Sequence, residues 1–177
     1  RGYLAATGNA DFGYFGGGST GSNVSTVDRI DYSNDTATAP AKGPLSFARG
    51  SLAATGNQSF GYFGGGSPGK STVDRIDYSN DTATAAVKGP LSLARWSLAA
   101  TGNSSFGYFG GGGVPSQRST VDRIDYSNDT ATAVAKGPLT TNKHFSAATG
   151  NSSFGYFGGG NPGPFSTVDR IDYSNDT

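Results

Sequence analysis

The chain is made of short segments in which apolar and polar residues alternate, separated by turns rich in Gly, Asn, Asp and Pro. Residues 49–94 show the pattern in full, and their apolar residues do not recur with the spacing of a helix of useful length. Composition and turn signals predict strands over residues 51–55, 60–63, 71–78 and 82–87. In the third strand the side chains alternate, so Val73, Arg75 and Asp77 point one way and Asp74, Ile76 and Tyr78 point the other.

This set of four strands recurs along the chain with a period of about 47 residues. The tetrad Ala-Ala-Thr-Gly, for example, ends at Gly8, Gly56, Gly102 and Gly150. The repeats cover residues 1–48, 49–94, 95–142 and 143–177, approximately, as one array. Four short strands in a unit of this length predict an all-β protein, a β-propeller with four-stranded blades. A β-solenoid is the alternative, but its coils of about 20–30 residues would require two coils in each repeat.

The number of repeats bears on the size of the propeller. The array holds three complete repeats and a fourth that stops after its third strand, at Thr177, without an outer strand. Propellers usually have about four to eight blades. We therefore expect the array to be part of a larger propeller, with a tight ring of four blades as the second possibility.

In the second repeat, an arginine precedes the first strand, a tyrosine lies in the second strand and a glycine pair follows it. These residues, with the matching positions of the third strand, are Arg49, Tyr62, Gly65, Gly66, Val73, Ile76 and Asp77. They resemble the kelch repeat, whose period is near 50 residues. The tryptophan of kelch blades is replaced by Ala37, Ala83 and Ala131. We expect the Phe and Tyr residues of the second strand to fill the core instead.

The near-identity of the four repeats is also similar to that of kelch-like repeats in proteins of marine bacteriophages. This resemblance implies a virion or tail-fibre context.

Each repeat carries two carboxylates three residues apart, such as Asp74 and Asp77. At this separation on a strand they face opposite sides, so they cannot share one water molecule or one metal ion. Arg75 and Asp77 lie on the same face, and we expect them to pair along or between strands. Carboxylates repeated in every unit indicate a structural ladder, whereas a catalytic dyad requires one asymmetric site.

Two other repeated motifs have structural interpretations. Asp-Tyr-Ser-Asn-Asp invites a calcium site, but Thr36 and Lys42 stand where an EF-hand loop needs Gly and Glu, so we expect a turn with side-chain-to-backbone hydrogen bonds. The triple glycines lack the helix and the Gly-Lys-Ser/Thr signature of a phosphate-binding loop. We expect them to allow close packing of backbones between repeats.

Charge and composition exclude several classes of function. Thirteen basic residues balance thirteen acidic ones, so no basic stripe is available for nucleic acid. No stretch reaches the roughly 18 apolar residues of a membrane span. With no cysteine and one histidine, the chain cannot build the copper site of a galactose-oxidase-like enzyme, which uses two histidines and a tyrosine cross-linked to cysteine. Almost every acid except Asp11 belongs to the repeat, which argues against a glycosidase. We expect no enzymatic activity, no cofactor and no metal ion.

The remaining candidates are the places where the repeats differ. His144 occupies the position of Gly50 and Trp96, just before the first strand of its repeat, which would be the inner strand of a kelch-like blade. We expect Tyr3, Trp96, His144 and Phe145 to line a binding face on which rings stack against sugars or side chains. The loops after the triple glycines, residues 19–24, 67–70, 113–118 and 161–165, vary in length and chemistry. Variable loops on a constant scaffold are common binding sites. Their candidate ligand-binding residues are Asn23, Lys70, Gln117, Arg118 and Phe165.

The sequence thus predicts a non-enzymatic binding or structural module outside the cell or on a virion, with a glycan or a surface protein as its ligand. Two alternatives stay open. One is a purely structural protein that assembles with other copies of itself into an appendage or surface layer. The other is a kelch-type adaptor that presents a partner protein inside the cell.

Overall fold

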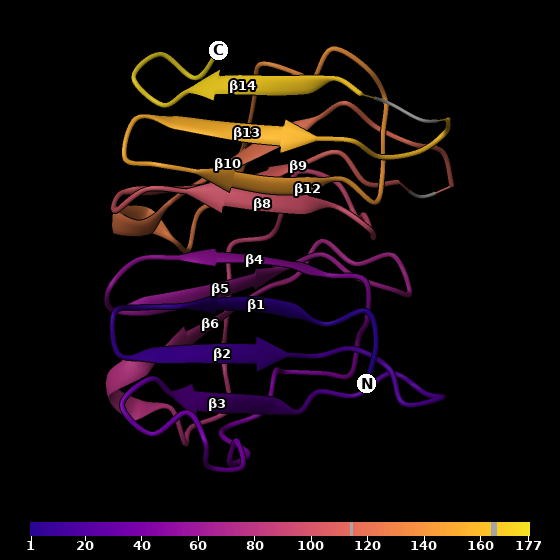
Figure 1. The fold of residues 1–177 in the computed structure, drawn as a ribbon. Helices are drawn as coiled ribbons and strands as arrows, with labels where there is room; N and C mark the ends of the chain where they lie inside the picture. The colour runs from indigo at the N-terminus through magenta and orange to yellow at the C-terminus, as the bar shows by residue number, and fades with distance from the viewer. Residues whose placement is uncertain (114, 164–165) are drawn as a thin grey trace.

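The computed structural model describes residues 1–113, 115–163 and 166–177 and shows an all-β protein of four antiparallel sheets, one in each repeat (Figure 1). The first sheet contains β1 (Ala5–Gly8), β2 (Phe12–Gly16) and β3 (Val27–Asp31). The second contains β4 (Ala53–Gly56), β5 (Phe60–Gly64), β6 (Val73–Asp77) and β7 (Ala86–Lys88). The third contains β8 (Ala99–Gly102), β9 (Phe106–Gly110), β10 (Val121–Asp125) and β11 (Val134–Lys136). The fourth contains β12 (Ala147–Gly150), β13 (Phe154–Gly158) and β14 (Val168–Asp172).

The sheets lie one above another, with β3 at one end of the stack and β14 at the opposite end (Figure 1). The first strands of successive repeats are neighbours, because β1 contacts β4, β4 contacts β8, and β8 contacts β12. Among the described residues, no contact of similar extent joins β12 back to β1. The four sheets therefore form an open series, and the prediction of a tight four-membered ring is wrong.

All four predicted strands of the second repeat are present, but the third and the fourth are shorter than predicted, since the third spans only Val73–Asp77. Residues 82–85 continue the turn that follows the short 3₁₀ segment Tyr78–Asn80, and the strand begins only at Ala86. In the first repeat the corresponding segment makes a single bridge between Asp28 and Ala41. Pro40 stands there at the position of Ala86, and a proline has no N–H to donate to the ladder.

The apolar cores lie between the sheets rather than within them. The core between the first two sheets joins Tyr14 and Val27 to Phe63, Ile76 and the stacked ring of Tyr78, and equivalent clusters follow it between the later sheets. The prediction that Phe and Tyr fill the core is therefore confirmed. Complete burial of one such side chain contributes roughly 1.5–3 kcal/mol.

The glycines make this close packing possible, as predicted. A Cβ built on Gly16 would lie 2.6 Å from the Phe63 ring, and one on Gly64 would lie 2.7 Å from the Phe109 ring. Gly65 has φ +69°, and its Cβ would lie 2.7 Å from the carbonyl oxygen of Arg95 in the next repeat. Any other residue at these positions would push neighbouring sheets apart.

One carboxylate per boundary ties adjacent repeats together. Asp81 accepts hydrogen bonds from the Tyr14 hydroxyl at 2.9 Å and from Arg29 at 2.8 Å, and Lys42 lies 3.3 Å away. Burial alone raises the pKa of Asp81, but hydrogen bonds from Tyr14, Lys42 and Arg29 outweigh it and hold the pKa below its usual value. Asp129 and Asp176 have the same three kinds of partner at the next two boundaries.

These contacts correct the predicted ladder. Arg75 pairs with Asp129 of the next repeat at 2.7 Å, not with Asp77. Asp77 instead accepts hydrogen bonds from the backbone N–H and the hydroxyl of Ser79, so the predicted turn with side-chain-to-backbone bonds is confirmed. Arg75 therefore pairs with the carboxylate of Asp129 in the neighbouring sheet rather than with that of Asp77 in its own strand.

A second ion pair lies inside each repeat. Arg49 contacts Asp74 at 2.9 Å with both side chains fully buried, and its other terminal nitrogen donates to the carbonyl oxygen of Phe63. Burial lowers the pKa of Arg49, and the charge of Asp74 opposes this shift. Equivalent pairs are Arg1–Asp28, Arg95–Asp122 and Lys143–Asp169. The arginine that carries the kelch resemblance is therefore a buried structural group.

Candidate functional site

One position just before the first strand of each repeat (β1, β4, β8 and β12) has an unusual backbone conformation. Tyr3, Ser51, Ser97 and Phe145 have φ of 57°, 54°, 54° and 56°. This left-handed conformation is uncommon for residues other than glycine and carries a strain on the order of 1–3 kcal/mol. Ser, Tyr and Phe have no special preference for the left-handed conformation, so the sequence does not predict it at these positions.

A chain of backbone hydrogen bonds stabilises this conformation. Ser51 N–H donates to the carbonyl oxygen of Tyr3 at 2.7 Å, Ser97 to Ser51 at 2.7 Å, and Phe145 to Ser97 at 2.9 Å. Each bond connects equivalent residues of successive repeats. The four residues are thereby held in a series at one end of β1, β4, β8 and β12.

These four residues line a pocket of about 250 Å³ together with Leu4, Leu52, Leu98 and Ser146. The leucines give it apolar walls. The Tyr3 and Phe145 side chains at the two ends of the series are 69% and 50% exposed. The hydroxyls of Ser97 and Ser146 are buried and have no hydrogen-bond partner among the described residues. The pocket thus combines aromatic rings, apolar walls and hydroxyl groups.

Three of the four predicted aromatic and histidine candidates cluster beside this pocket. The Trp96 ring lies 5.9 Å from the His144 ring and 6.1 Å from the Phe145 ring, both edge-on, and the His144 and Phe145 centroids are 4.5 Å apart. Edge-on contacts are a preferred arrangement of aromatic rings. Tyr3 joins them through the pocket lining, two repeats away from Trp96. The structure therefore brings together residues from the first, third and fourth repeats.

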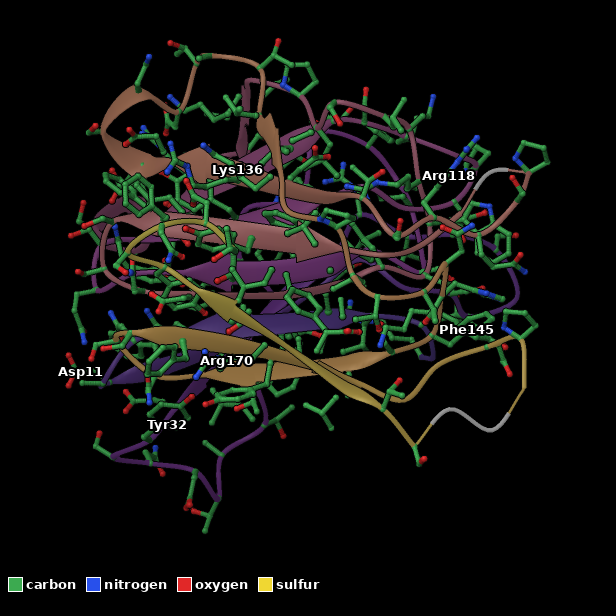
Figure 2. The ribbon with its side chains drawn as sticks, turned by 90° about the horizontal axis from the view of Figure 1, so that it is seen from above. Asp11, Tyr32, Arg118, Lys136, Phe145 and Arg170 are labelled. Carbon is green, nitrogen blue, oxygen red and sulfur yellow. The ribbon has the colours of Figure 1, made fainter. Side chains whose placement is uncertain are left out.

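The variable loops lie at the same end of the sheets. Backbone bridges join Gly2 to Ser19, Gly50 to Ser67, Trp96 to Gly113 and His144 to Asn161. Phe145 and Arg118 lie on one side of the molecule in Figure 2, whereas Asp11 and Tyr32 lie on the opposite side. We call the end that carries residues 2–3, 50–51, 96–97 and 144–145 and the described parts of the variable loops the loop rim.

The individual loop candidates have different surroundings. Asn23 donates from its side chain to the carbonyl oxygen of Ser67 at 2.9 Å, so it joins two loops. Lys70 lies over the Phe47 ring, 5.3 Å from its centroid. Gln117 bridges to Gly113 and is partly buried, while Arg118 is exposed and bridges to Lys143. Phe165 lies outside the described residues.

The described residues contain no group of three or more His, Cys, Asp or Glu side chains placed to hold a metal ion. In the same part of the chain, no helix has the length and apolarity to cross a membrane. Comparison with known proteins gives no match to any family model or to any curated protein. The loop rim must therefore be interpreted from its own chemistry.

Proposed function

We propose that this chain is a non-enzymatic, kelch-like β-propeller module that binds a glycan at the loop rim, outside the cell or on a virion. The observation that carries the proposal is the convergence of Tyr3, Trp96, His144 and Phe145 with the variable loops on that rim.

The stacking of the sheets supports the propeller interpretation. Each complete interior repeat is a four-stranded antiparallel sheet, its first strand neighbours the first strands of the adjacent repeats, and the core lies between sheets. This is the arrangement expected of propeller blades, which bury their faces against one another. The resemblance of Arg49, Tyr62, Gly65 and Gly66 to the kelch pattern agrees with it.

The chemistry of the rim supports a sugar as ligand. A sugar ring has apolar C–H faces and a border of hydroxyl groups. The exposed rings of Tyr3 and Phe145 suit the faces, and the partly buried Ser51 of the same pocket suits the border. Binding sites of this kind combine apolar and aromatic walls with a few polar groups that fix orientation.

An array of immobilised oligosaccharides tests the proposal, followed by calorimetry with the best ligand. Phe145→Ser and Trp96→Gly introduce the residues that Ser97 and Gly50 provide at the same positions of other repeats, so the fold is expected to persist. Loss of one stacked ring removes about 0.5–1.5 kcal/mol. We therefore expect each variant to bind up to about tenfold more weakly.

Val134→Ala serves as the control, because Val134 is an exposed apolar residue on β11 and Ala86 holds the same position in β7. Its affinity should equal that of the unmodified chain. Absence of any bound oligosaccharide, or equal weakening by all three variants, would refute glycan binding at the loop rim.

A further inference from the structure

The loop rim carries positive charge that no carboxylate neutralises among the described residues. Lys70 and Arg118, on two of the variable loops, belong to no ion pair in that part of the chain. The basic residues that directly precede the rim in each repeat, in contrast, all pair with an aspartate of the third strand. These pairs are Arg1–Asp28, Arg49–Asp74, Arg95–Asp122 and Lys143–Asp169. The rim therefore has two uncompensated cations, and both come from positions where the repeats differ.

Carboxylates outside ion pairs gather at the opposite end of the sheets. The rim itself contains no acidic residue. One aspartate ends the third strand of each repeat, opposite the first residue of the second strand and away from the variable loop, and accepts hydrogen bonds from a serine of the following turn. These aspartates are Asp31, Asp77, Asp125 and Asp172. The two ends therefore differ in charge, and an anion is attracted to the rim and repelled at the other end.

Both cations lie on loops that are bonded to the aromatic cluster of the rim. The backbone N–H of the residue before Trp96 donates to the Lys70 carbonyl oxygen at 3.0 Å. The backbone N–H of the residue before His144 donates to the Arg118 carbonyl oxygen at 3.1 Å. Arg118 is exposed and lies on the same side of the molecule as Phe145 (Figure 2). A sugar that stacks on these rings therefore has two cationic side chains on the same rim.

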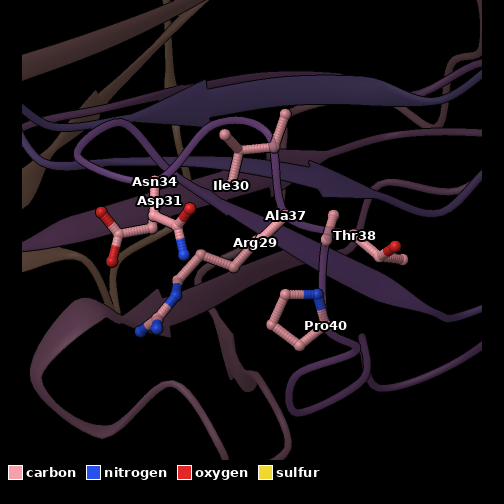
Figure 3. Close-up of a pocket in the computed structure, with 8 residues that line it drawn as sticks. Arg29, Ile30, Asp31, Asn34, Ala37, Thr38 and Pro40 are labelled. Carbon is pink, nitrogen blue, oxygen red and sulfur yellow. The ribbon is translucent and has the colours of Figure 1, made fainter.

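A hollow in the first repeat has the opposite chemistry (Figure 3). It has a volume of about 260 Å³, and Arg29 and Asp31 are among the residues that line it. Arg29 contacts Asp81 at 2.8 Å, so its charge is already neutralised. An anion in this hollow would meet the Asp31 carboxylate and no uncompensated cation. Of the two sites, the loop rim is the one that suits an anion.

We propose that the ligand of the loop rim is an acidic glycan, whose carboxylate or sulfate groups pair with Lys70 and Arg118. This proposal rests on the proposed function, since it assigns the class of sugar that the same site binds. The planar guanidinium of Arg118 presents two parallel N–H donors to the oxygens of such a group, and the ammonium of Lys70 acts as a compact charge.

Pairs of oligosaccharides that differ only in one acidic group test the proposal on the same array and by calorimetry. Lactose is compared with sialyllactose, which adds a carboxylate, and with sulfated lactose, which adds a sulfate. We expect the acidic member of a pair to bind more tightly, and we expect this preference to weaken at high salt because salt screens charges at a surface. The two arms distinguish a carboxylate ligand from a sulfate ligand.

The first repeat supplies the variants that remove the charges. Val24 stands where Lys70 and Arg118 stand, directly before the constant Ser-Thr-Val-Asp segment, and its carbonyl oxygen accepts the same backbone bond from the next repeat. Lys70→Val and Arg118→Val are therefore expected to preserve the fold. Each should weaken binding of the acidic member about two- to fivefold, as expected for an ion pair at a surface. Binding of the neutral member should not change.

Ser59→Asp is the matched control. It makes the same change in net charge on a turn at the opposite end, and Asp11 provides the same residue at that position of the first repeat. Its side chain is exposed, and the hydrogen bonds of Ser59 are made by its backbone. This variant should keep the affinity and the preference of the unmodified chain.

The proposal is overturned if neutral members bind as tightly as acidic ones, or if both valine variants keep the full preference. Phe145→Ser separates this result from a failure of glycan binding itself. If that variant still weakens binding, the rim is a glycan site without selectivity for charge. If no oligosaccharide binds at all, both proposals are wrong.

Discussion

The interior and terminal repeats carry nearly the same sequence but differ in how their residues are buried. Arg49 and Asp74 in the second repeat are 2.9 Å apart and fully buried, while Arg1 and Asp28 in the first repeat are also 2.9 Å apart with side chains 11% and 33% exposed. The distance between the charged groups is the same in both pairs, but their burial differs. The comparison teaches that a residue of this array takes its energetic role from the neighbouring sheet more than from its own repeat.

The buried ion pair provides the largest expected effect. Asp74→Ala leaves the Arg49 guanidinium buried without a partner, and we expect a loss of about 3–5 kcal/mol in the free energy of unfolding. Asp28→Ala removes the equivalent carboxylate at a partly exposed site, where an ion pair contributes about 0–1 kcal/mol. Urea unfolding of both variants measures the difference. Equal losses would show that burial does not distinguish the two pairs.

Two equivalent glycines provide the second largest expected effect on stability. Gly89 and Gly137 hold the same position in successive repeats. A Cβ on Gly89 would overlap the carbonyl oxygen of Ala131, whereas one on Gly137 would lie 3.1 Å from the Asp176 carbonyl oxygen and 3.5 Å from the Thr177 Cα. We expect Gly89→Ala to destabilise the protein by about 1–3 kcal/mol through overpacking.

Gly137→Ala should be nearly neutral, because the small gain from a less flexible unfolded chain offsets the tighter contact. Thermal unfolding of the two variants in parallel gives the comparison. A melting temperature lowered equally in both would mean that the interior boundary is no tighter than the terminal one.

Acidification is expected to have the smallest effect on the free energy of unfolding, and it acts through the aspartates at the boundaries between repeats. The folded-state pKa values of Asp81, Asp129 and Asp176 are lowered, so the folded state holds these protons less tightly than the unfolded state. Their stabilising contribution is therefore complete above the ordinary value of 3.8 and is lost as the pH falls below it. Stability should decline below about pH 4.

Urea unfolding at several pH values measures the acid effect. Asp129→Asn should make the decline in stability at low pH shallower, because Asp129 binds Tyr62, Arg75 and Lys88. An unchanged decline in this variant would contradict the assignment.

The candidate site was predictable in part. Trp96 and His144 stand out because they replace Gly50 at one position of a nearly constant repeat, and the structure does place them together. Ser51, Ser97 and the leucines of the pocket were not predictable, because they belong to the repeated pattern and carry no signal of their own. Their participation follows from the left-handed backbone at Ser51 and Ser97 and from the hydrogen bonds between repeats.

The sequence by itself determined the local structure. Alternation, glycine turns and the period of the repeat predict the first three strands of each sheet, and these depend on contacts close in sequence. The tertiary structure alone decided the partners across repeats. Because the repeats share their Arg, Tyr and Asp residues, no pattern could tell whether Arg75 pairs with Asp77 or with Asp129. Only the stacking of the next sheet, which brings Asp129 within 2.7 Å and buries Phe63 against Gly16, made that choice.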